Sequence, residues 1–389
     1  MTSAKSITQS AFDGSRLRVL LLVDLNEGAQ QQFLDAYEHM RHHVASVPGH
    51  LGDQLCQSAE NPSQWLITSE WESAPPYLAW VNSEAHIETV RPMQSCVRDL
   101  RSMRYHIVRE TGGAAPPPAP AARGVHQATA AAKTAGAAGG VHAPPRVGDG
   151  LIRHALTFTV KPGSESKVAE ILADYAPPKS RVDDTTRLCR TTLFMHGNRV
   201  VRTVEVQGDL VAALRHVSRQ PEVRAVEEAL NPHLEQSRDL NDPESARAFF
   251  TRAAMPAVHH VTRGGPEPSG LRRHALYYPA REGCGLMLAR LLAQQDETAA
   301  DDPAGPVHRS TVFHREDLVV RLVDVSGDPE ADPVRVLGVH GEKKAAVLAR
   351  LLDGAALGIR GPLAGERDAT RLLAHAGMTL ITDRTAPRP

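Results

Sequence analysis

Cysteine, aromatic residues and blocks of like charge are all scarce in this chain of 389 residues. Its four cysteines lie far apart with no CxxC pair, so we expect neither a disulfide framework nor a zinc knuckle. The reducing cytoplasm is therefore the expected location. The formal net charge is −1, from 44 basic and 45 acidic residues without a run of one sign. This balance argues against nucleic acid or an anionic membrane as a partner.

Long apolar runs and nucleotide or metal motifs are missing as well. The longest apolar runs, such as Val19–Val23, fit a strand and are far too short to span a bilayer. The N-terminus, MTSAKSITQSAFDGS, has no apolar stretch of the kind found in a signal peptide. No GxGxxG follows an expected strand, and there is no Walker loop and no HExxH. The sequence thus predicts a soluble globular protein without a recognisable cofactor motif.

Alanine, glycine and proline dominate residues 111–149. Such a segment cannot bury enough apolar surface to offset its ordering entropy, so we expect a linker there. A shorter break at 264–269 is a second expected linker, and residues 1–15 are expected to form a disordered tail. Three expected domains remain: 16–110, 150–263 and 270–385.

The second and third domains repeat each other. The segment GLIRHAL at Gly150–Leu156 reappears as GLRRHAL at Gly270–Leu276. Three further pairs follow in the same order: RTTLF and RSTVF from Arg190 and Arg309, VVR from Val200 and Val319, VQGD and VSGD from Val206 and Val325. The offset is 119 or 120 residues throughout, which indicates two copies of one module.

The pattern of apolar residues predicts the fold of each domain. Each copy begins with a short strand, continues with a helix of i, i+3, i+4 spacing, and then shows two β-rich runs across a polar turn. A second helix and a final strand complete the copy, and residues 16–110 show the same order. We therefore expect an α+β protein of three ferredoxin-like βαββαβ units, the second and third being internal repeats that pack as a pseudo-dimer.

The first domain concentrates the aromatic residues. It holds seven of the sixteen, including all three tryptophans, several of them in the stretch SEWESAPPYLAW. Strand alternation places Trp65, Ile67 and Trp71 on one face of the strand before this stretch. Side chains of this kind at such density indicate a packed core, a cavity for a flat molecule, or both.

Several motifs of the first domain resemble the antibiotic biosynthesis monooxygenase superfamily. They are the turn VPGHLGDQ at 47–54, the strand end SEWES at 69–73, and Trp80 with His86. The repeated domains resemble the SchA/CurD-like domains of spore-pigment and aromatic polyketide clusters. The first resemblance implies a small α+β barrel that dimerises through its sheet. Some members bind a flat polycyclic phenol between sheet and helices and oxidise it with O2, without metal, flavin or haem.

This resemblance also implies site residues. The tryptophan, tyrosine and arginine of the anthrone-oxidising members fall on Trp71, Tyr77 and Arg91, while their asparagine falls on Ile67. The isoleucine removes an amide that could bind a substrate carbonyl. Trp71 can stack on a substrate ring and donate its N–H, or it can simply fill the barrel. Arg91 can bind a phenolate or be a solvated helix arginine, and Tyr77 can relay a proton or be a half-buried rim residue.

Histidines supply the candidate general base. His50 and His86 are the candidates, because an imidazole has a pKa near the working pH. No histidine spacing matches a metal motif, and no acidic residue is placed to complete a metal-binding triad. Trp65, Ile67 and Trp80 are candidate substrate-binding residues, with a core role as the alternative. In haem-degrading relatives the histidine ligand would fall on Val90, which disfavours haem.

Arg202 and Arg321 occupy the strand position of Ile67 in the two repeats. An arginine buried there needs a partner, because an unpaired buried charge costs several kcal/mol. The partner can be an anionic substrate, which would make both arginines substrate-binding, or a carboxylate of the neighbouring copy. Structural pairing is the favoured interpretation.

The sequence thus predicts a cofactor-free oxygenase, with O2 as co-substrate, that converts a polycyclic aromatic polyketide phenol or anthrone to a quinone. The alternative is a non-redox cyclase or an accessory binding protein of an aromatic polyketide pathway. We expect a small-molecule substrate and a homodimer, and association with tailoring enzymes of the polyketide synthase is a further hypothesis.

Overall fold

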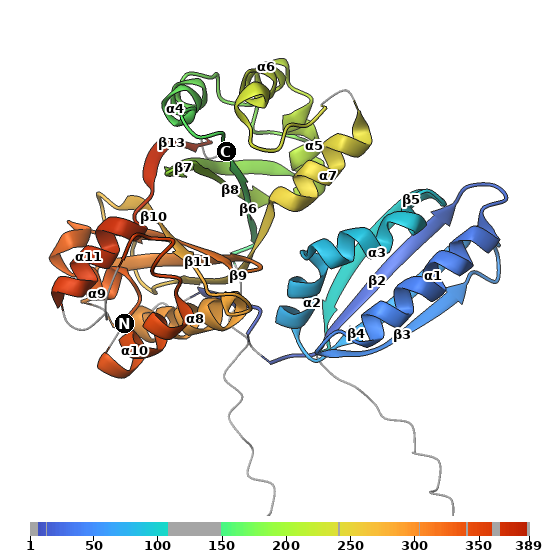
Figure 1. Ribbon diagram of the computed structural model, residues 1–389, viewed down its shortest axis with the longest axis horizontal. Coiled ribbons are helices and arrows are strands. Elements are labelled where there is room, and N and C mark those ends of the chain that lie inside the picture. The colour runs from blue at the N-terminus through green and yellow to red at the C-terminus, as the bar shows by residue number, and fades with distance from the viewer. Residues whose placement is uncertain are drawn as a thin grey trace, which may run out of the picture.

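The computed structural model describes residues 7–12, 14–107, 149–239, 242–302, 304–339, 341–359 and 366–386. The expected linker at 111–149 lies outside these residues apart from Asp149. The α+β class is confirmed, because helices pack on antiparallel sheets in every part of the described chain (Figure 1). Within the described ranges, no helix is long and apolar enough to cross a membrane.

The N-terminal domain, residues 14–107, contains one four-stranded sheet with helices on one face (Figure 1). Its elements are β2 (Leu17–Leu25), α1 (Gln30–Ala45), β3 (His50–Gln57), β4 (Gln64–Trp71), α2 (Ala74–Val81), α3 (Glu84–Gln94) and β5 (Val97–His106). The strand order is β3-β4-β2-β5, with all neighbours antiparallel, as in a split βαβ unit. Ser83 caps α3 by accepting a hydrogen bond from the backbone N–H of His86, which fixes where this helix begins.

Alternation along β4 is as predicted. Trp65, Ile67 and Trp71 are 7%, 3% and 1% exposed, and they pack under the helices in two apolar clusters. The opposite face of the same sheet carries Leu22, 43% exposed, and Tyr105, 51% exposed. One face of this sheet is therefore core, and the other has no covering layer within the described chain.

The second and third segments, residues 149–263 and 270–386, have similar elements. The second contains β6 (Leu151–Thr159), α4 (Glu165–Ala173), β7 (Arg187–His196), β8 (Arg199–Gln207), α5 (Leu210–Ser218), α6 (Pro221–Leu230), α7 (Pro243–Ala253) and β9 (Ala254–Thr262). The third contains β10 (Arg272–Pro279), α8 (Gly285–Ala300), β11 (Val307–Arg315), β12 (Leu318–Val325), α9 (Pro333–Val336), α10 (Glu342–Leu351), α11 (Glu366–Ala376) and β13 (Thr379–Thr385).

These two segments share one sheet and do not form separate units. Its order is β10-β12-β11-β9-β6-β8-β7-β13, so each segment's last strand pairs with the other segment. Residues 257–262 of β9 pair with β11, and β13 pairs with β7. The N–H of Met378 also donates to the carbonyl of Ala275 at 2.9 Å, which brings the two ends of the sheet together. The exchange nearly closes a barrel and leaves few open strand edges.

Residues 7–10 form a strand, β1 (Ile7–Ser10), which differs from the disordered tail expected for residues 1–15. Strand β9 pairs with β6 only through Ala254–Pro256, so one edge of residues 259–262 is open beyond that point. β1 pairs antiparallel along this open edge. Residues 7–10 form a strand because they pair with backbone groups of β9 that β6 does not reach.

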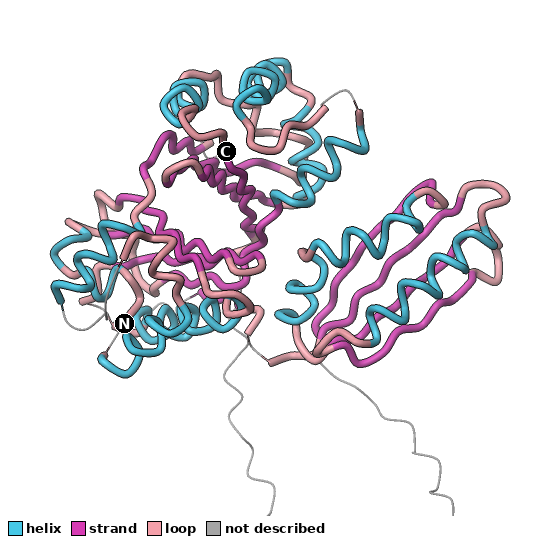
Figure 2. The backbone as a smooth tube through the Cα atoms, viewed as in Figure 1, coloured by secondary structure: helices cyan, strands magenta, loops and turns pink. Residues whose placement is uncertain are grey.

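The interior of the barrel is built in layers. Within each segment the neighbouring strands pair in corresponding registers, and helices lie outside the strands on both sides (Figure 2). The middle layer is apolar and consists of Ala155, Phe194, Val201, Met255, Ala275, Phe313, Val320, Leu322 and Met378. One end carries buried charges, and the other end carries Arg199 and Tyr277, which line a pocket.

Candidate functional site

An aromatic cluster lies in the N-terminal domain where the end of β4 meets α2. The rings of His50 and Tyr77 pack edge-on against Trp71, with centroids at 5.1 Å and 5.5 Å. The indole Nε1 donates to Oγ of Ser69 at 3.1 Å. Trp71 is therefore completely enclosed, and its only donor is already used within the chain.

Tyr77 has a cationic neighbour that the sequence did not reveal. Nε of Arg104, on β5, donates to the Tyr77 hydroxyl at 3.2 Å, and its guanidinium carbon lies 5.6 Å from the ring centroid. Arg104 lies opposite Val19 in the register and so shares the helix-covered face of the sheet. The positive charge beside the aromatic cluster is thus Arg104.

His50 belongs to a polar chain with Asp53 and Tyr37. The Tyr37 hydroxyl donates to the Asp53 carboxylate, and His50 Nε2 lies 3.7 Å from Asp53 Oδ1. Within the described chain this nitrogen is buried without a hydrogen-bond partner. Burial lowers the pKa of His50, although the Asp53 charge opposes the shift. Burial and the Asp53 carboxylate raise the pKa of Tyr37 well above its ordinary value, so at neutral pH Tyr37 keeps its proton and donates a hydrogen bond to Asp53.

A pocket of 520 Å³ opens beside this chain, between α1 and β3. Asp53 and Tyr37 are in its wall, together with Leu34, Asp35, Glu38, Arg41 and Leu55. A volume of this size lies within the range that small organic ligands occupy. A proton donor bound in the pocket can reach the Asp53 carboxylate, with His50 behind it as a second acceptor.

The sequence did not find this arrangement because a local irregularity creates it. His50 and Asp53 are three residues apart, which in a regular strand places them on opposite faces. The register between β3 and β4 shifts between His50 and Gly52, so His50 lies opposite Trp71 and Asp53 opposite Ser69. Strand alternation therefore could not indicate that Asp53 lies beside His50. Tyr37, on α1, gave no sequence signal that we can identify.

Other candidates lie outside this cluster. Arg91 is exposed on α3 and pairs with Glu88 at 2.7 Å. His86 packs edge-on against Trp80 with centroids at 5.3 Å, and burial lowers its pKa to about 4. Its Nδ1 is buried without a hydrogen-bond partner among the described residues. Among the described residues, Arg91 and His86 form no hydrogen bond, ion pair or ring contact with Trp71, His50 or Asp53. Trp80 packs against the edge of the apolar cluster that contains Trp71.

Trp65 and Ile67 lie in the core between β4 and α1. The Trp65 ring is 5.6 Å from that of Phe33, which is fully buried on α1. Ile67 packs in the same cluster at 3% exposure. Neither side chain lines the pocket beside Asp53.

Arg202 and Arg321 are paired inside the second and third segments. Arg202 donates to Glu227 of α6 at 3.0 Å. Arg321, fully buried, donates from Nε and Nη2 to Asp296 of α8 at 2.9 Å and 2.6 Å. Each partner belongs to the arginine's own segment, so the expected partner from the neighbouring copy is wrong. The reason is that both side chains point toward the helices and not into the barrel.

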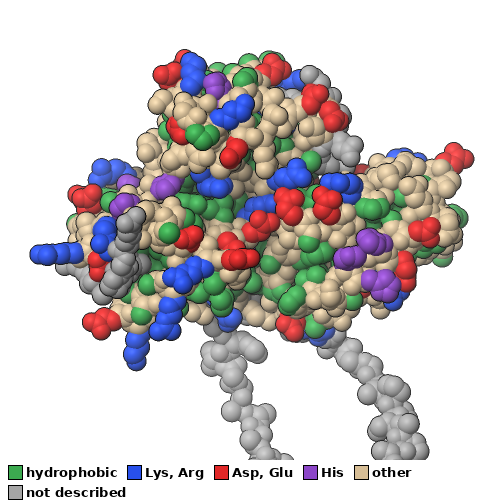
Figure 3. Space-filling model, in the orientation of Figure 1, with side chains coloured by type: hydrophobic (Ala, Val, Ile, Leu, Met, Phe, Trp, Pro, Cys, Tyr) green, Lys and Arg blue, Asp and Glu red, His purple; other side chains and the backbone are tan. Residues whose placement is uncertain are grey.

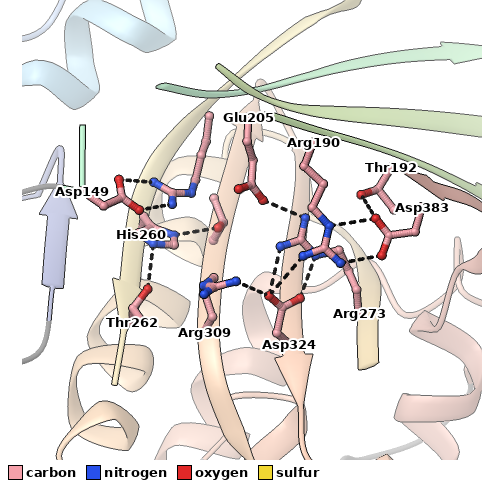
Figure 4. A network of polar contacts seen from close by, with 12 residues as sticks. Asp149, Arg190, Thr192, Glu205, His260, Thr262, Arg273, Arg309, Asp324 and Asp383 are labelled. Atoms are coloured by element: carbon pink, nitrogen blue, oxygen red, sulfur yellow. Dashed lines mark hydrogen bonds and ion pairs between the residues drawn. The ribbon is translucent and has the colours of Figure 1, made fainter. Parts of the chain in front are cut away.

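Ion pairs do connect the two segments, at the charged end of the barrel (Figure 4). Arg273 donates to Glu205 at 2.7 Å and to Asp324 at 2.7 Å and 3.0 Å. Arg190 donates to Asp383 at 2.8 Å. Burial disfavours the Asp324 carboxylate, but the hydrogen bonds and charge of Arg273 outweigh this and hold its pKa below the ordinary value. Among the described residues, no group of three or more His, Cys, Asp or Glu could hold a metal ion.

Two family models match parts of this chain. Residues 16–92 match the model of the antibiotic biosynthesis monooxygenase family, and residues 151–263 match that of the SchA/CurD like domain. The chain is 73% identical to "Polyketide synthase CurD" of Streptomyces cyaneus, over 100% of both chains. It is 58% identical to the "42.8 kDa protein in whiE locus" of Streptomyces coelicolor, covering 98% of this chain and 91% of that one.

Several solved structures match about a quarter of this chain. One is SnoaB, described as a cofactor-independent oxygenase from Streptomyces nogalater. It is 10% identical, covers 25% of this chain and 96% of its own, and has a TM-score of 0.23.

Proposed function

The chain belongs to the SchA/CurD-like family, and we propose that its N-terminal domain oxidises a polycyclic aromatic polyketide phenol or anthrone with O2, without a cofactor. The observation that carries the proposal is the pocket whose wall contains Asp53, linked to Tyr37 and close to His50. A phenol needs a base to become electron-rich enough to react with O2, and this carboxylate and imidazole supply one. The match of residues 16–92 to the monooxygenase family supports the same chemistry.

The proposed reaction balances without an external reductant. Asp53 takes a proton from the phenol form of an anthrone, and the anion transfers one electron to O2. Superoxide then combines with the ring carbon radical to form a peroxide. After protonation the O–O bond breaks, the second hydrogen leaves the same ring carbon, and water and a quinone carbonyl result. One atom of O2 enters the product and the other becomes water.

The side chains around the pocket have separate roles in this proposal. Asp53 receives the proton, and the His50 ring lies beside it, with Nε2 3.7 Å from Asp53 Oδ1 and a pKa that burial lowers. Tyr37 keeps its hydroxyl proton and holds the carboxylate in one orientation. Trp71 is a positioning residue, because its ring packs against the His50 ring and orients it.

A second candidate function is a non-redox one: a polyketide cyclase or an accessory binding protein. Two observations favour it. The Trp71 N–H is used by Ser69, and Ile67 offers no amide, so neither can bind a substrate oxygen in this arrangement. The relative described as "Polyketide synthase CurD" is also compatible with a role before any oxidation.

We also propose that the chain forms a homodimer through the uncovered face of the N-terminal sheet. Leu22 and Tyr105 are exposed there, at 43% and 51%. A Leu22→Arg variant should then elute at the monomer mass in size-exclusion chromatography with light scattering, whereas the wild type elutes at the dimer mass. Equal masses for the two proteins would remove this part of the proposal.

Oxygen consumption tests the proposed reaction. Protein dialysed against EDTA should consume one O2 per anthrone oxidised. Asp53→Asn should lower kcat by about 10²- to 10⁴-fold, because an amide cannot accept the proton. Asp99→Asn, an exposed carboxylate of the same domain, is the matched control and should leave kcat unchanged. An Asp53→Asn variant as active as wild type would contradict the proposed base.

A further inference from the structure

A second pocket, of 390 Å³, lies at the junction between the N-terminal domain and the shared barrel. It opens at the end of the barrel opposite the buried ion pairs, under α7 and the turn between β11 and β12. Glu84 at the start of α3 completes its rim from the N-terminal domain. Charged side chains of both signs gather at this junction on the surface (Figure 3). The pocket is separate from the one that contains Asp53.

The acidic side chains of this pocket have partners within the chain. Glu84 accepts from Arg252 at 3.2 Å, and Asp317 accepts from the backbone N–H groups of Gly283 and Gly285 at 2.9 Å and 3.0 Å. Glu316 lies 3.8 Å from Arg315. These contacts reduce the negative charge that a ligand meets.

Two of the three arginines are held in the same way. Arg252 is paired with Glu84. Arg315 donates to the backbone carbonyls of Thr251 and Ala254 at 2.8 Å and 3.3 Å, which fixes it at the end of α7. Both guanidinium groups therefore have structural roles.

Arg199 differs from them. Its Nη1 donates to Oγ1 of Thr157 at 3.2 Å, and its guanidinium carbon lies 5.9 Å from the ring centroid of Tyr277. It has no carboxylate partner among the described residues. A guanidinium beside an aromatic ring presents free N–H donors for an anionic oxygen and a flat surface for a ring system.

The internal repeat shows that the fold does not require this pair. Arg199 corresponds to Leu318 in the register. Each is the first residue of its strand and pairs with the last residue of both neighbouring strands. Tyr277 corresponds to Thr157, because each lies two residues before the end of the first strand of its segment. The two copies thus form the same strands with leucine and threonine at these positions. The second segment supplies the cation and the third supplies the aromatic ring.

We propose that this pocket binds a flat aromatic molecule that carries a carboxylate or phenolate. Arg199 binds the anionic oxygen, and Tyr277 and Phe158 pack against the rings. The three residues proposed to bind the ligand lie outside the N-terminal domain, and the site is independent of the oxidation proposed there. Because Glu84 forms part of the rim, a bound ligand also contacts the boundary between the domains.

Ligand binding by the full chain tests this site, with anthraquinone-2-carboxylate as the anionic probe and 2-(hydroxymethyl)anthraquinone as the neutral one. Arg199→Leu places the residue of the other repeat at this position. This substitution should weaken binding of the anionic probe by about tenfold to a hundredfold, because a hydrogen bond to a charged group is lost. The affinity for the neutral probe should change by about twofold or less. Tyr277→Thr also introduces the residue of the other repeat, and it should weaken the binding of both probes.

Three variants serve as controls. Arg224→Leu, on the exposed side of α6, should bind both probes as the wild type does. Asp53→Asn should also leave the anionic probe's affinity for this pocket unchanged, which separates the site from the proposed oxidation site. If Arg199→Leu does not fold, Arg199→Gln removes the charge with less change in shape and should show the same loss. Unchanged binding in the Arg199 variants, or no preference of the wild type for the anionic probe, would overturn the proposal.

Discussion

Arg273 on β10 and Glu205 on β8 form an ion pair across the two repeats, with Nη1 and Oε1 at 2.7 Å and both side chains nearly excluded from solvent. The same guanidinium binds Asp324 of its own segment. Burying these charges is costly, and it is tolerated only because each lies within hydrogen-bond distance of an opposite charge. The pair therefore makes correct assembly of the two halves a condition for stability.

Removing one partner of this pair should be strongly destabilising. Arg273→Leu leaves Glu205 and Asp324 without their shared cation, and we expect the free energy of unfolding to fall by about 3–5 kcal/mol. Urea denaturation measures the loss. Arg335→Leu breaks a partly exposed pair with Asp302 and should cost about 1 kcal/mol or less. Equal effects of the two variants would contradict the structural role of Arg273.

Cleavage between the repeats should not separate them. Strand β9 pairs with β11, and β13 pairs with β7, so each half supplies a strand to the other. With a protease site inserted at 264–269, we expect the cut products to elute together under native conditions and to separate only in denaturant. Elution as two independent folded fragments would show that the exchange does not hold the halves together.

The sequence predicted the features that depend on local periodicity, and it missed those that depend on strand edges and irregularities. Alternation was sufficient to place Trp65, Ile67 and Trp71 on the core face of β4. The 119- to 120-residue offset indicated a module present twice, but no local pattern tells which edge a final strand will join. The pairing of β1 with β9 has the same origin, because it depends on an edge left open by β6.

The candidate site shows the same division. His50 could be proposed from its chemistry, yet its neighbour Asp53 depends on the register shift next to Gly52, which alternation cannot predict. Arg104 was missed because its contact with Tyr77 joins β5 to α2 across the sheet, a contact with no signature in spacing. The arginine that the resemblance indicated, Arg91, lies on the surface of α3.

Acid should weaken the fold partly through His314 on β11. This side chain is 2% exposed, and burial lowers its pKa to about 4 despite a contact from Nε2 to the Glu316 carbonyl. The unfolded chain takes up this proton near pH 6.5, so between about pH 6.5 and 4 it binds more protons than the folded chain. Stability is therefore lost as the pH falls through this window, by about 2 kcal/mol from pH 7 to pH 5 for this group.

Denaturation at pH 7 and pH 5 measures this contribution. His314→Gln should reduce the difference in the free energy of unfolding between pH 7 and pH 5 by about 2 kcal/mol, because the variant has no imidazole that must stay neutral in the folded chain. His42→Gln, at an exposed position on α1, is the control and should leave the difference as in the wild type. A His314→Gln variant with the full pH dependence would show that other groups account for it.

Trp71→Phe should lower kcat for oxidation about tenfold or more while the melting temperature changes little. The smaller ring loses the hydrogen bond to Ser69 and part of its contact with His50, so the base is less well oriented. Steady-state kinetics measure kcat, and a thermal melt measures the melting temperature. Trp80→Phe, which alters a ring next to His86, is the matched control. A loss of stability in step with the loss of kcat would mean that Trp71 acts only as core.

Oxygen isotope incorporation tests the proposed oxidation most directly. The EDTA-treated full chain is incubated with an anthrone under ¹⁸O2, and product and water are analysed by mass spectrometry. The proposal predicts one ¹⁸O atom in the new quinone carbonyl, the other in water, and loss of both signals in Asp53→Asn relative to Asp99→Asn. A product formed without label or oxygen uptake would contradict the oxygenase assignment and favour the non-redox role.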